Sequence, residues 1–206
     1  MSKRSKVVWG VIVAGIVALT LGAHLAGQNA RQLKAGDSFP LTRLSNIHGT
    51  DVLIPDGHAR WVHLQFRRFA GCPICNLHLH SIVTRYPEIQ AAGIREVVVF
   101  HSPNTSLLPY QGQFPFDVIG DPDKTLYRQF GVETSIYAIL NPAAWPSMFK
   151  GHALTDRPSG DPEGGPLGLP ADLLIAADGR VAASHYGRHA YDQWSVDELL
   201  ALANAR

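Results

Sequence analysis

The sequence predicts an α/β domain in which a mixed β-sheet is covered by helices. Segments with the composition of β-strands alternate with helical segments through the middle of the 206-residue chain. The chain then ends with a β-hairpin and a last helix. Strand–helix–strand units followed by a hairpin are typical of a sheet that combines parallel and antiparallel strands.

A strand, a loop and a helix form the first of these units. The segment Trp61–Phe66 is the predicted strand, and residues 67–71 form the loop after it. We predict that a helix starts near Pro73, because the first helical position does not need the N–H group that proline lacks. Pro87 should kink or restart this helix. The next strand, at residues 96–100, is almost entirely apolar, as expected for a strand covered on both faces.

The C-terminal elements have clear turn and capping signals. Residues 173–176 and 181–186 flank an Asp-Gly turn and therefore predict a β-hairpin. Ser195 and Glu198 have the spacing of a capping box, which places the start of the last helix.

The remaining elements are shorter. Residues 41–44, 52–54 and 116–119 each predict a short strand. Residues at about 134–168 read as an insertion, with a helical piece near 145–149 that packs on the domain. The end of the insertion is rich in glycine and proline, which predicts an exposed loop.

An apolar segment precedes the domain. Residues 1–6 are basic, residues 7–27 are apolar, residues 28–34 form a polar linker, and the domain occupies residues 35–206. The apolar run has about the length of a transmembrane helix. It is long for a signal peptide and lacks a good cleavage site, so we favour an uncleaved signal anchor over a cleaved signal peptide.

The basic residues predict the orientation of this anchor. They lie on the N-terminal side, which should therefore stay in the cytoplasm. In a bacterium this gives a single-pass protein of the inner membrane whose domain faces the periplasm. Small residues four apart also allow a homodimer through one helix face; they are Gly10, Ala14, Ala18 and Gly22.

The formal net charge of +1 does not indicate a basic surface that binds nucleic acid. The two cysteines of the chain lie in one tetrapeptide, Cys72-Pro73-Ile74-Cys75. A zinc site would need two further ligands. This spacing instead indicates a dithiol that forms a disulfide, and we expect no cofactor. Because Cys72 precedes a helix, the helix N-terminus should stabilise its thiolate.

Other polar residues are expected at the same edge of the sheet. Arg67 and Arg68 follow the first strand and His101 follows the next, so parallel strands would bring them together with the cysteines. The arginines could lower the pKa of Cys72, or they could belong to a solvated loop. Asp172 could act in proton transfer or simply start a strand.

The order of the elements resembles the thioredoxin fold: a strand, Cys-Pro-Ile-Cys, a helix, and then residues 168–172 leading into a hairpin. The resemblance is to its redoxin branch, with the alkyl hydroperoxide reductase C and thiol-specific antioxidant families and peroxiredoxin-like relatives. The segment Arg68–Cys75 matches their R-x-x-G-C-x-x-C pattern. The Gly36-Asp37-x-x-Pro40 opening and residues 116–121 also look like redoxin domains, and the resemblance covers about residues 35–205.

This resemblance implies an antioxidant oxidoreductase. Cys72 would attack a disulfide as the nucleophile and Cys75 would resolve the mixed disulfide. With a hydroperoxide, Cys72 would become a sulfenic acid that condenses with Cys75. Its partners would be protein thiols and disulfides or hydroperoxides, with a thiol system as electron donor. Pro170 would be a cis-proline that faces the dithiol.

One departure favours disulfide exchange over peroxide reduction. Typical peroxiredoxins carry a P-x-x-x-T-x-x-C segment, but Gln65 and Phe69 stand at the proline and threonine positions here. The threonine hydroxyl that contacts peroxide is therefore absent, and a thiol peroxidase proper is the alternative.

A further alternative is a membrane-anchored copper chaperone of the Sco type. Such proteins use two cysteines and a distant histidine, and thiolates are suitable ligands for Cu(I). Their cysteines are usually three residues apart rather than two. His152, His185 or His189 would have to supply the third ligand.

Overall fold

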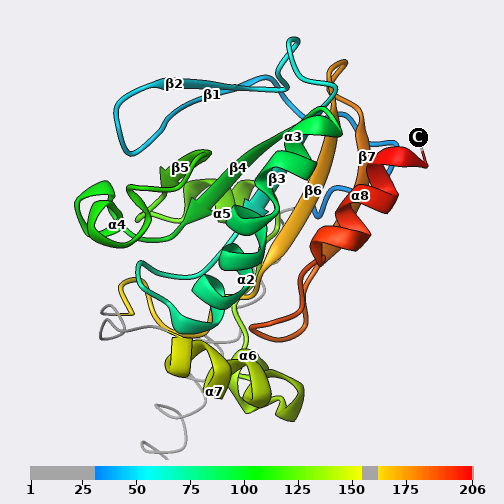
Figure 1. Cartoon of the computed structure of the whole chain (residues 1–206). Helices are drawn as coiled ribbons and strands as arrows, with labels where there is room; N and C mark the ends of the chain where they lie inside the picture. The colour runs from blue at the N-terminus through cyan, green and yellow to red at the C-terminus, as the bar shows by residue number, and fades with distance from the viewer. Residues whose placement is uncertain (1–30, 155–161, 206) are drawn as a thin grey trace, which may run out of the picture. The chain divides into compact units, whose positions relative to one another are not determined.

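The computed structural model describes residues 31–154 and 162–205. A five-stranded sheet with the order β5-β4-β3-β6-β7 forms the centre of the domain, and β1 and β2 form a separate two-stranded sheet (Figure 1). The strands are β1 (Thr42–Ser45), β2 (Asp51–Ile54), β3 (Trp61–Phe66), β4 (Ile94–Phe100), β5 (Asp117–Gly120), β6 (Ala171–Ala176) and β7 (Val181–Tyr186). The helices are α2 (Pro73–Thr84), α3 (Tyr86–Ala91), α4 (Asn104–Gln111), α5 (Thr125–Gln129), α6 (Tyr137–Leu140), the 3-10 helix η2 (Pro142–Ala144), α7 (Trp145–Leu154) and α8 (Val196–Asn204).

The sheet is mixed, as the sequence predicts. Strands β3, β4 and β5 are parallel, whereas β6 and β7 pair antiparallel to their neighbours. Every residue of β3 is buried, because both of its faces are covered. This arrangement of helices around a mixed sheet is a thioredoxin-like fold.

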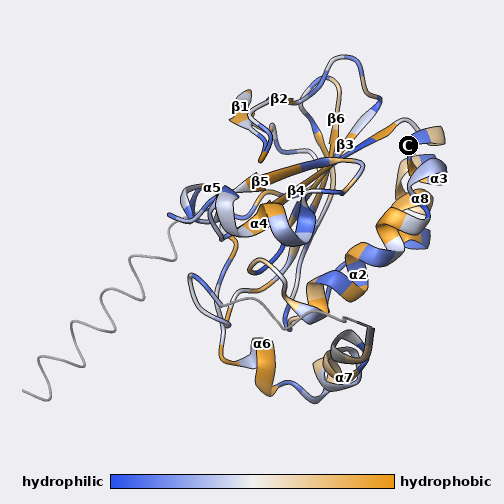
Figure 2. Ribbon diagram, turned by 60° about the vertical axis from the view of Figure 1, so that its left-hand side comes forward, coloured by the Kyte–Doolittle hydropathy of each residue, from blue (hydrophilic) through white to orange (hydrophobic). Residues whose placement is uncertain are grey.

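Alternate residues of the strands supply two separate cores. One core lies on the face covered by α2 and α8 and includes Trp61, Val98 and Trp194. The other lies on the face covered by β2 and α5 and includes Val62, Leu64 and Phe66. Figure 2 shows hydrophobic residues along α8 and along the central strands of the sheet. The even and odd positions of β3 thus point to opposite faces.

The first strand–helix unit confirms the predictions for this region. Helix α2 starts at Pro73 with Cys72 as its N-cap residue. It ends at Thr84, and α3 starts at Tyr86 with Pro87 in its first turn. Because proline fits the first turn of a helix, it restarts the chain here as predicted.

The C-terminal hairpin and helix are also confirmed. Gly179 adopts φ 85° in the turn between β6 and β7. Ser195 and Glu198 form both hydrogen bonds of the capping box at the start of α8. Strand β6 starts at Ala171, two residues earlier than predicted, because its pairing with β3 already begins there.

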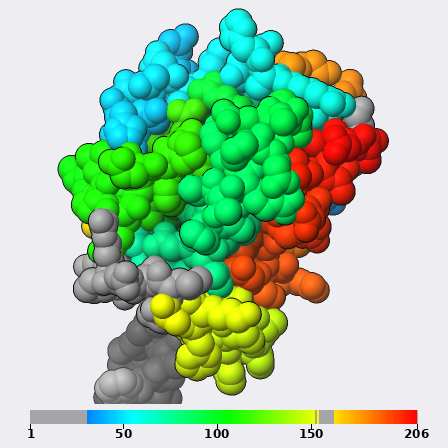
Figure 3. All heavy atoms as spheres, in the orientation of Figure 1, coloured from blue at the N-terminus to red at the C-terminus, as the bar shows by residue number. Residues whose placement is uncertain are grey.

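The insertion packs on the start of α2. Its helix α7 lies directly against this end of α2 in the space-filling view (Figure 3). A Cβ atom at Gly151 would lie 2.5 Å from the carbonyl oxygen of Pro73, so the two backbones are in close contact. Met148 packs against the core as expected, but Trp145 and Phe149 are exposed. The insertion therefore covers the segment that carries the cysteines.

The predicted transmembrane anchor at residues 7–27 lies outside the described residues. Within residues 31–154 and 162–205, no helix has the length and apolar character needed to cross a bilayer.

The contact at Gly151 can be tested by adding one methyl group. We predict that Gly151→Ala displaces α7 from α2, because its Cβ atom would overlap a backbone oxygen. The buried cysteines should then react several-fold faster with iodoacetamide. Gly57→Ala is the matched control, since a Cβ atom there meets nothing within 4 Å. An alkylation rate equal to that of the control would contradict the covering role of α7.

Candidate active site

Cys72 and Cys75 form a reduced, buried dithiol at the start of α2. The Sγ atom of Cys72 accepts a hydrogen bond from the backbone N–H of Cys75 at 3.4 Å. The two residues are 0% and 3% exposed, so a substrate can reach their sulfur atoms only after neighbouring groups move. The structure thus brings the two predicted site residues together at the expected helix end.

The parallel pairing of β3 and β4 places two loops side by side at this end of the sheet. The backbone N–H of His101 donates to the carbonyl oxygen of Arg68 at 3.0 Å. The N–H of Ala70 donates to the hydroxyl of Ser102 at 3.0 Å. Gly71 then turns the chain into α2 with φ 66°, a conformation that favours glycine. The prediction that both loops meet at one edge is confirmed.

The cysteine with the lowered pKa is not the one that the sequence predicts. Burial raises the pKa of the Cys72 thiol well above its usual value, and its hydrogen bond with Cys75 raises it further. Burial also acts to raise the pKa of Cys75, but the hydrogen bond with Cys72 and the positive charge of Arg68 lower it to about 7. The helix-based expectation of a low pKa at Cys72 considered neither desolvation nor the interaction between the sulfur atoms.

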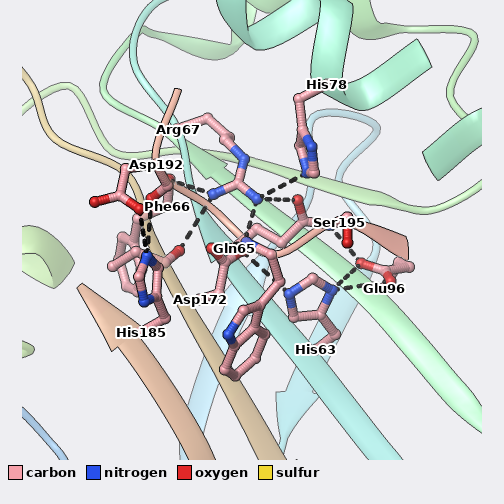
Figure 4. Close-up of polar contacts among 12 residues, drawn as sticks. His63, Gln65, Phe66, Arg67, His78, Glu96, Asp172, His185, Asp192 and Ser195 are labelled. Carbon is pink, nitrogen blue, oxygen red and sulfur yellow. Dashed lines mark hydrogen bonds and ion pairs between the residues drawn. The ribbon is translucent and has the colours of Figure 1, made fainter. Parts of the chain in front are cut away.

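Arg67 is buried beneath α2 and forms a dense set of polar contacts (Figure 4). Its Nη2 donates to Asp172 Oδ1 at 2.6 Å and to Gln65 Oε1 at 2.6 Å. Its Nη1 donates to the carbonyl oxygen of Phe66 at 2.9 Å. The same Nη2 also lies 3.1 Å from His78 Nε2. The solvated-loop alternative for Arg67 is wrong, because the side chain is only 2% exposed.

His63 extends this cluster across the sheet. Its Nδ1 lies 2.9 and 3.0 Å from the two carboxylate oxygens of Glu96, and its Nε2 lies 3.2 Å from Asp172 Oδ1. Burial alone would lower the pKa of His63, but the charge of Glu96 and the hydrogen bond to Asp172 raise it to about 9. Burial would raise the pKa of Asp172, but Arg67 and His63 hold it far below its usual value.

Opposite charges balance in this cluster. With His63 protonated, the positive charges of Arg67 and His63 face the carboxylates of Glu96 and Asp172. Buried charges are tolerated when each is paired and hydrogen-bonded, whereas loss of one partner leaves an uncompensated charge. Asp172 is therefore more than the first polar residue of a strand, because it fixes Arg67 below the helix that carries the dithiol.

Sequence reasoning missed Glu96, Gln65 and His78. The available signal is the alternation of His63, Gln65 and Arg67, which places three polar side chains on one face of a buried strand. The strand register provides the rest, because His63 is paired with Glu96 and Gln65 with Asp172. That register cannot be read from the sequence alone.

Arg68 and His101 lie in the two loops that meet at this edge of the sheet. The Arg68 Nη2 donates to the carbonyl oxygen of Pro166, and its guanidinium lies 5.2 Å from the centre of the Phe69 ring. The Nδ1 atom of His101 lies 2.8 Å from the carbonyl oxygen of Glu163. Burial lowers the pKa of His101 to about 4, so this histidine is neutral. Neither residue belongs to a solvated loop.

Pro170 differs from its predicted conformation. The single cis peptide bond among the described residues joins Ile54 and Pro55, so the Leu169–Pro170 bond is trans. Leu169 N–H donates to Glu133 and the Pro170 carbonyl accepts from Gly187, which holds this segment in an ordinary extended entry to β6. Pro170 lines a separate pocket of about 440 Å³, whose other residues include Tyr137, Asn141, Tyr186 and Arg188.

The histidines whose side chains the structure describes do not form a metal site with the cysteines. His78 is buried and His80 is exposed on another side of α2, because residues two positions apart do not share a helix face. His185 instead pairs with Asp192 at 3.0 Å. In the part of the chain that the structure describes, no group of three His, Cys, Asp or Glu residues could hold a metal ion.

Solved structures with the same fold cover most of this chain. Peroxidoxin BcpB from Mycobacterium tuberculosis is 17% identical, with a TM-score of 0.61 and coverage of 84% of this chain and 98% of its own. A reduced 2-Cys peroxiredoxin from Plasmodium vivax is 14% identical, with a TM-score of 0.60 and coverage of 84% and 81%. A structure assigned as thiol:disulfide interchange protein DsbE, from Chlorobium tepidum, is 21% identical, with a TM-score of 0.55 and coverage of 84% and 99%.

At these identities the structures establish the fold, and no curated protein sequence matches the chain. The sequence itself matches the family model of the AhpC/TSA antioxidant enzymes over residues 81–189, which is more than half of the chain. The match begins after Cys75, so it is independent of the two cysteines. The chain therefore belongs to the AhpC/TSA antioxidant enzyme family, whose members are thiol-dependent oxidoreductases.

Proposed function

We propose that this protein is a membrane-anchored antioxidant oxidoreductase that uses the Cys72–Cys75 pair. The observation that carries the proposal is the reduced dithiol at the start of α2, where the hydrogen bond with Cys72 and the charges of Arg68 and Arg67 lower the pKa of Cys75. A thiolate near neutral pH is the reactive form in disulfide exchange and in peroxide reduction.

Cys72 is proposed as the nucleophile and Cys75 as the resolving residue. In the resting dithiol the thiolate is favoured on Cys75, and Cys72 shares a hydrogen bond with it. Transfer of that shared proton from Cys72 to Cys75 produces the Cys72 thiolate without changing the total charge of the site. After Cys72 has formed a mixed disulfide, Cys75 lies one helical turn away and displaces the product.

Arg67 and Arg68 are proposed to stabilise the negative charge of the pair. Both are among the groups that lower the pKa of Cys75. A positive charge near a buried thiolate offsets part of its desolvation cost. Asp172 keeps the Arg67 guanidinium in place, while the contact with Pro166 does so for Arg68. Asp172 is therefore assigned a positioning role rather than proton transfer.

Protein disulfides and hydroperoxides are both proposed as oxidants of the dithiol, with a thiol system that reduces it again. The family favours a peroxide, whereas the absence of the usual threonine favours a disulfide. A thiol peroxidase proper remains the alternative function.

The apolar segment at residues 7–27 is proposed to anchor the enzyme in the inner membrane of a bacterium. Its length, lack of charge and preceding basic residues support a single span with the domain in the periplasm. An oxidising compartment suits an enzyme whose substrates include disulfides. The small residues of the span also support a homodimer, which Ala14→Leu should disrupt; unchanged association of that variant would rule it out.

We predict that the two cysteine variants fail at different steps. The Cys72→Ser variant should lose the oxidation of the dithiol by hydrogen peroxide and by a protein disulfide. The Cys75→Ser variant should react once and accumulate a mixed disulfide with its substrate, because nothing resolves it. Both outcomes can be measured by stopped-flow fluorescence and by mass spectrometry of the trapped species. Trapping by Cys72→Ser instead would reverse the two roles, and activity of both variants would refute the function.

We also predict that the full chain remains in the membrane fraction after carbonate extraction. Its domain should be digested by protease added to spheroplasts. The double variant Ala14→Asp/Ala18→Asp should leave the membrane, because each charge near the centre of a span costs about 2.5–3.5 kcal/mol. A wild-type chain that stays soluble, or one that is digested only after cell lysis, would contradict the proposed location.

A further inference from the structure

The insertion exposes five large apolar side chains to solvent. The segment that contains them, residues 134–149, has no charged residue. Three other large apolar side chains are exposed in the described part of the chain, and they lie elsewhere on the domain. Large exposed apolar patches mark surfaces that bind another molecule. The five residues form what we call the insertion patch: Ile136, Tyr137, Leu140, Trp145 and Phe149.

Two short helices present the insertion patch to solvent. In α6, Ala138 is buried and its neighbours on the patch are exposed. In α7, Met148 packs against the core, whereas Trp145 and Phe149 lie one helical turn apart and are exposed. The indole N–H of Trp145 donates to the carbonyl oxygen of Ile139 at 3.1 Å, which joins α7 to α6. Both helices lie at the same end of the domain (Figure 1 and Figure 2).

The chain enters the domain beside this insertion. The side-chain amide of Gln32 donates to the carbonyl oxygen of Gly131 at 3.3 Å. Gln32 and Tyr137 also line the same pocket of about 440 Å³. The backbone N–H of Leu33 donates to the hydroxyl of Tyr186 at 2.9 Å. These contacts fix the entry point of the chain next to α6.

The length of chain before Gln32 limits which surface of the domain can face a membrane. The proposed membrane span ends at residue 27, five residues before Gln32. Five residues reach at most about 18 Å when fully extended. A domain of the length of residues 32–206 is about 40 Å across. With residues 7–27 in the bilayer, the surface around Gln32 is therefore the one that faces the lipid.

We propose that the insertion patch docks onto the lipid bilayer in which the chain is anchored. This inference rests on the proposed anchor and adds a second membrane contact to it. Tryptophan and tyrosine rings favour the headgroup level of a bilayer, and leucine, isoleucine and phenylalanine side chains enter the acyl boundary. Because residues 134–149 carry no charge, docking does not bury one.

Docking also affects where the dithiol lies. Helix α7 packs on the start of α2, where the backbone of Gly151 approaches the carbonyl oxygen of Pro73. A patch on α6 and α7 that contacts lipid therefore holds the cysteine-bearing end of α2 close to the bilayer surface.

The test uses one fluorescent label on the full chain. The Cys72→Ser/Cys75→Ser protein has no cysteine left, so Phe149→Cys provides a single site for a nitrobenzoxadiazole label. Leu41→Cys is the matched control, because the two side chains are 74% and 71% exposed for Leu41 and Phe149. Leu41 precedes β1, which lies at the opposite end of the domain from α6 and α7 (Figure 1 and Figure 2).

Each labelled protein is reconstituted into vesicles of phosphatidylcholine and phosphatidylglycerol in equal amounts. Fluorescence is compared with and without lipid that carries a nitroxide near its headgroup. The label at residue 149 should be quenched about threefold more than the label at residue 41, because interfacial segments bury their apolar face about 5–10 Å into the headgroup boundary.

Two further variants carry the label at residue 149. Ile136→Ser/Leu140→Ser should remove most of the quenching, because two apolar side chains of the patch can then no longer enter the lipid. Leu108→Ser removes an exposed leucine outside the patch and should leave the quenching unchanged. All three side chains are exposed, so these changes spare the core.

Flotation of the vesicles separates the docking from the anchor. Protein that does not float with the vesicles would refute the proposed anchor and the docking with it. Protein that floats, but whose two labels are quenched equally, would overturn the docking and leave the anchor intact. A label at residue 149 that shifts to the blue only at high protein-to-lipid ratio, without quenching by the nitroxide, would assign the patch to a second copy of the chain and overturn the docking too.

Discussion

The ion pair between Arg67 and Asp172 is the interaction on which the active site depends. It joins the loop after β3 to the beginning of β6, and it lies beneath the helix that starts at the two cysteines. The Asp172 carboxylate remains ionised in this interior because the charges of Arg67 and His63 lower its pKa, and His63 also contacts Glu96. Removal of any one of the four charges would leave its partner buried without compensation, which is costly. The cluster thus fixes a positive charge near a thiolate, and the pairing of three strands sets its position.

Much of the fold could be predicted because its signals are local. Pro73 and Pro87 define helix starts, the Asp-Gly turn defines the hairpin, and Ser195 with Glu198 defines the start of α8. The position of the dithiol at one edge of the sheet could also be predicted from local signals, because the carboxyl ends of parallel strands meet at the same edge. The trans Leu169–Pro170 bond was not predicted, since the resemblance implied a cis-proline and the local contacts of this segment are set by distant residues.

The chemistry of the site was harder to predict because it depends on burial and on distant partners. The sequence showed a helix N-terminus at Cys72, but burial and the neighbouring sulfur move the lowered pKa to Cys75. Glu96 and Asp172 join the cluster only through strand register. The close contact of Gly151 with Pro73 likewise depends on how the insertion packs, and it means that the dithiol must be uncovered before a substrate can react.

The most direct test of this account is the titration of the reduced dithiol by thiolate absorbance at 240 nm. The wild-type enzyme should show one thiol with a pKa of about 7. In the charge-balanced double variant Arg67→Gln/Asp172→Asn this pKa should rise by about one unit, because a nearby opposite charge shifts a pKa by about 1–3 units. The exposed pair Arg43 and Asp51 provides a matched control, Arg43→Gln/Asp51→Asn, which should titrate like the wild type. An unchanged pKa in the Arg67→Gln/Asp172→Asn variant would contradict the claim that Arg67, held in place by Asp172, contributes to the lowered pKa of the reactive thiol.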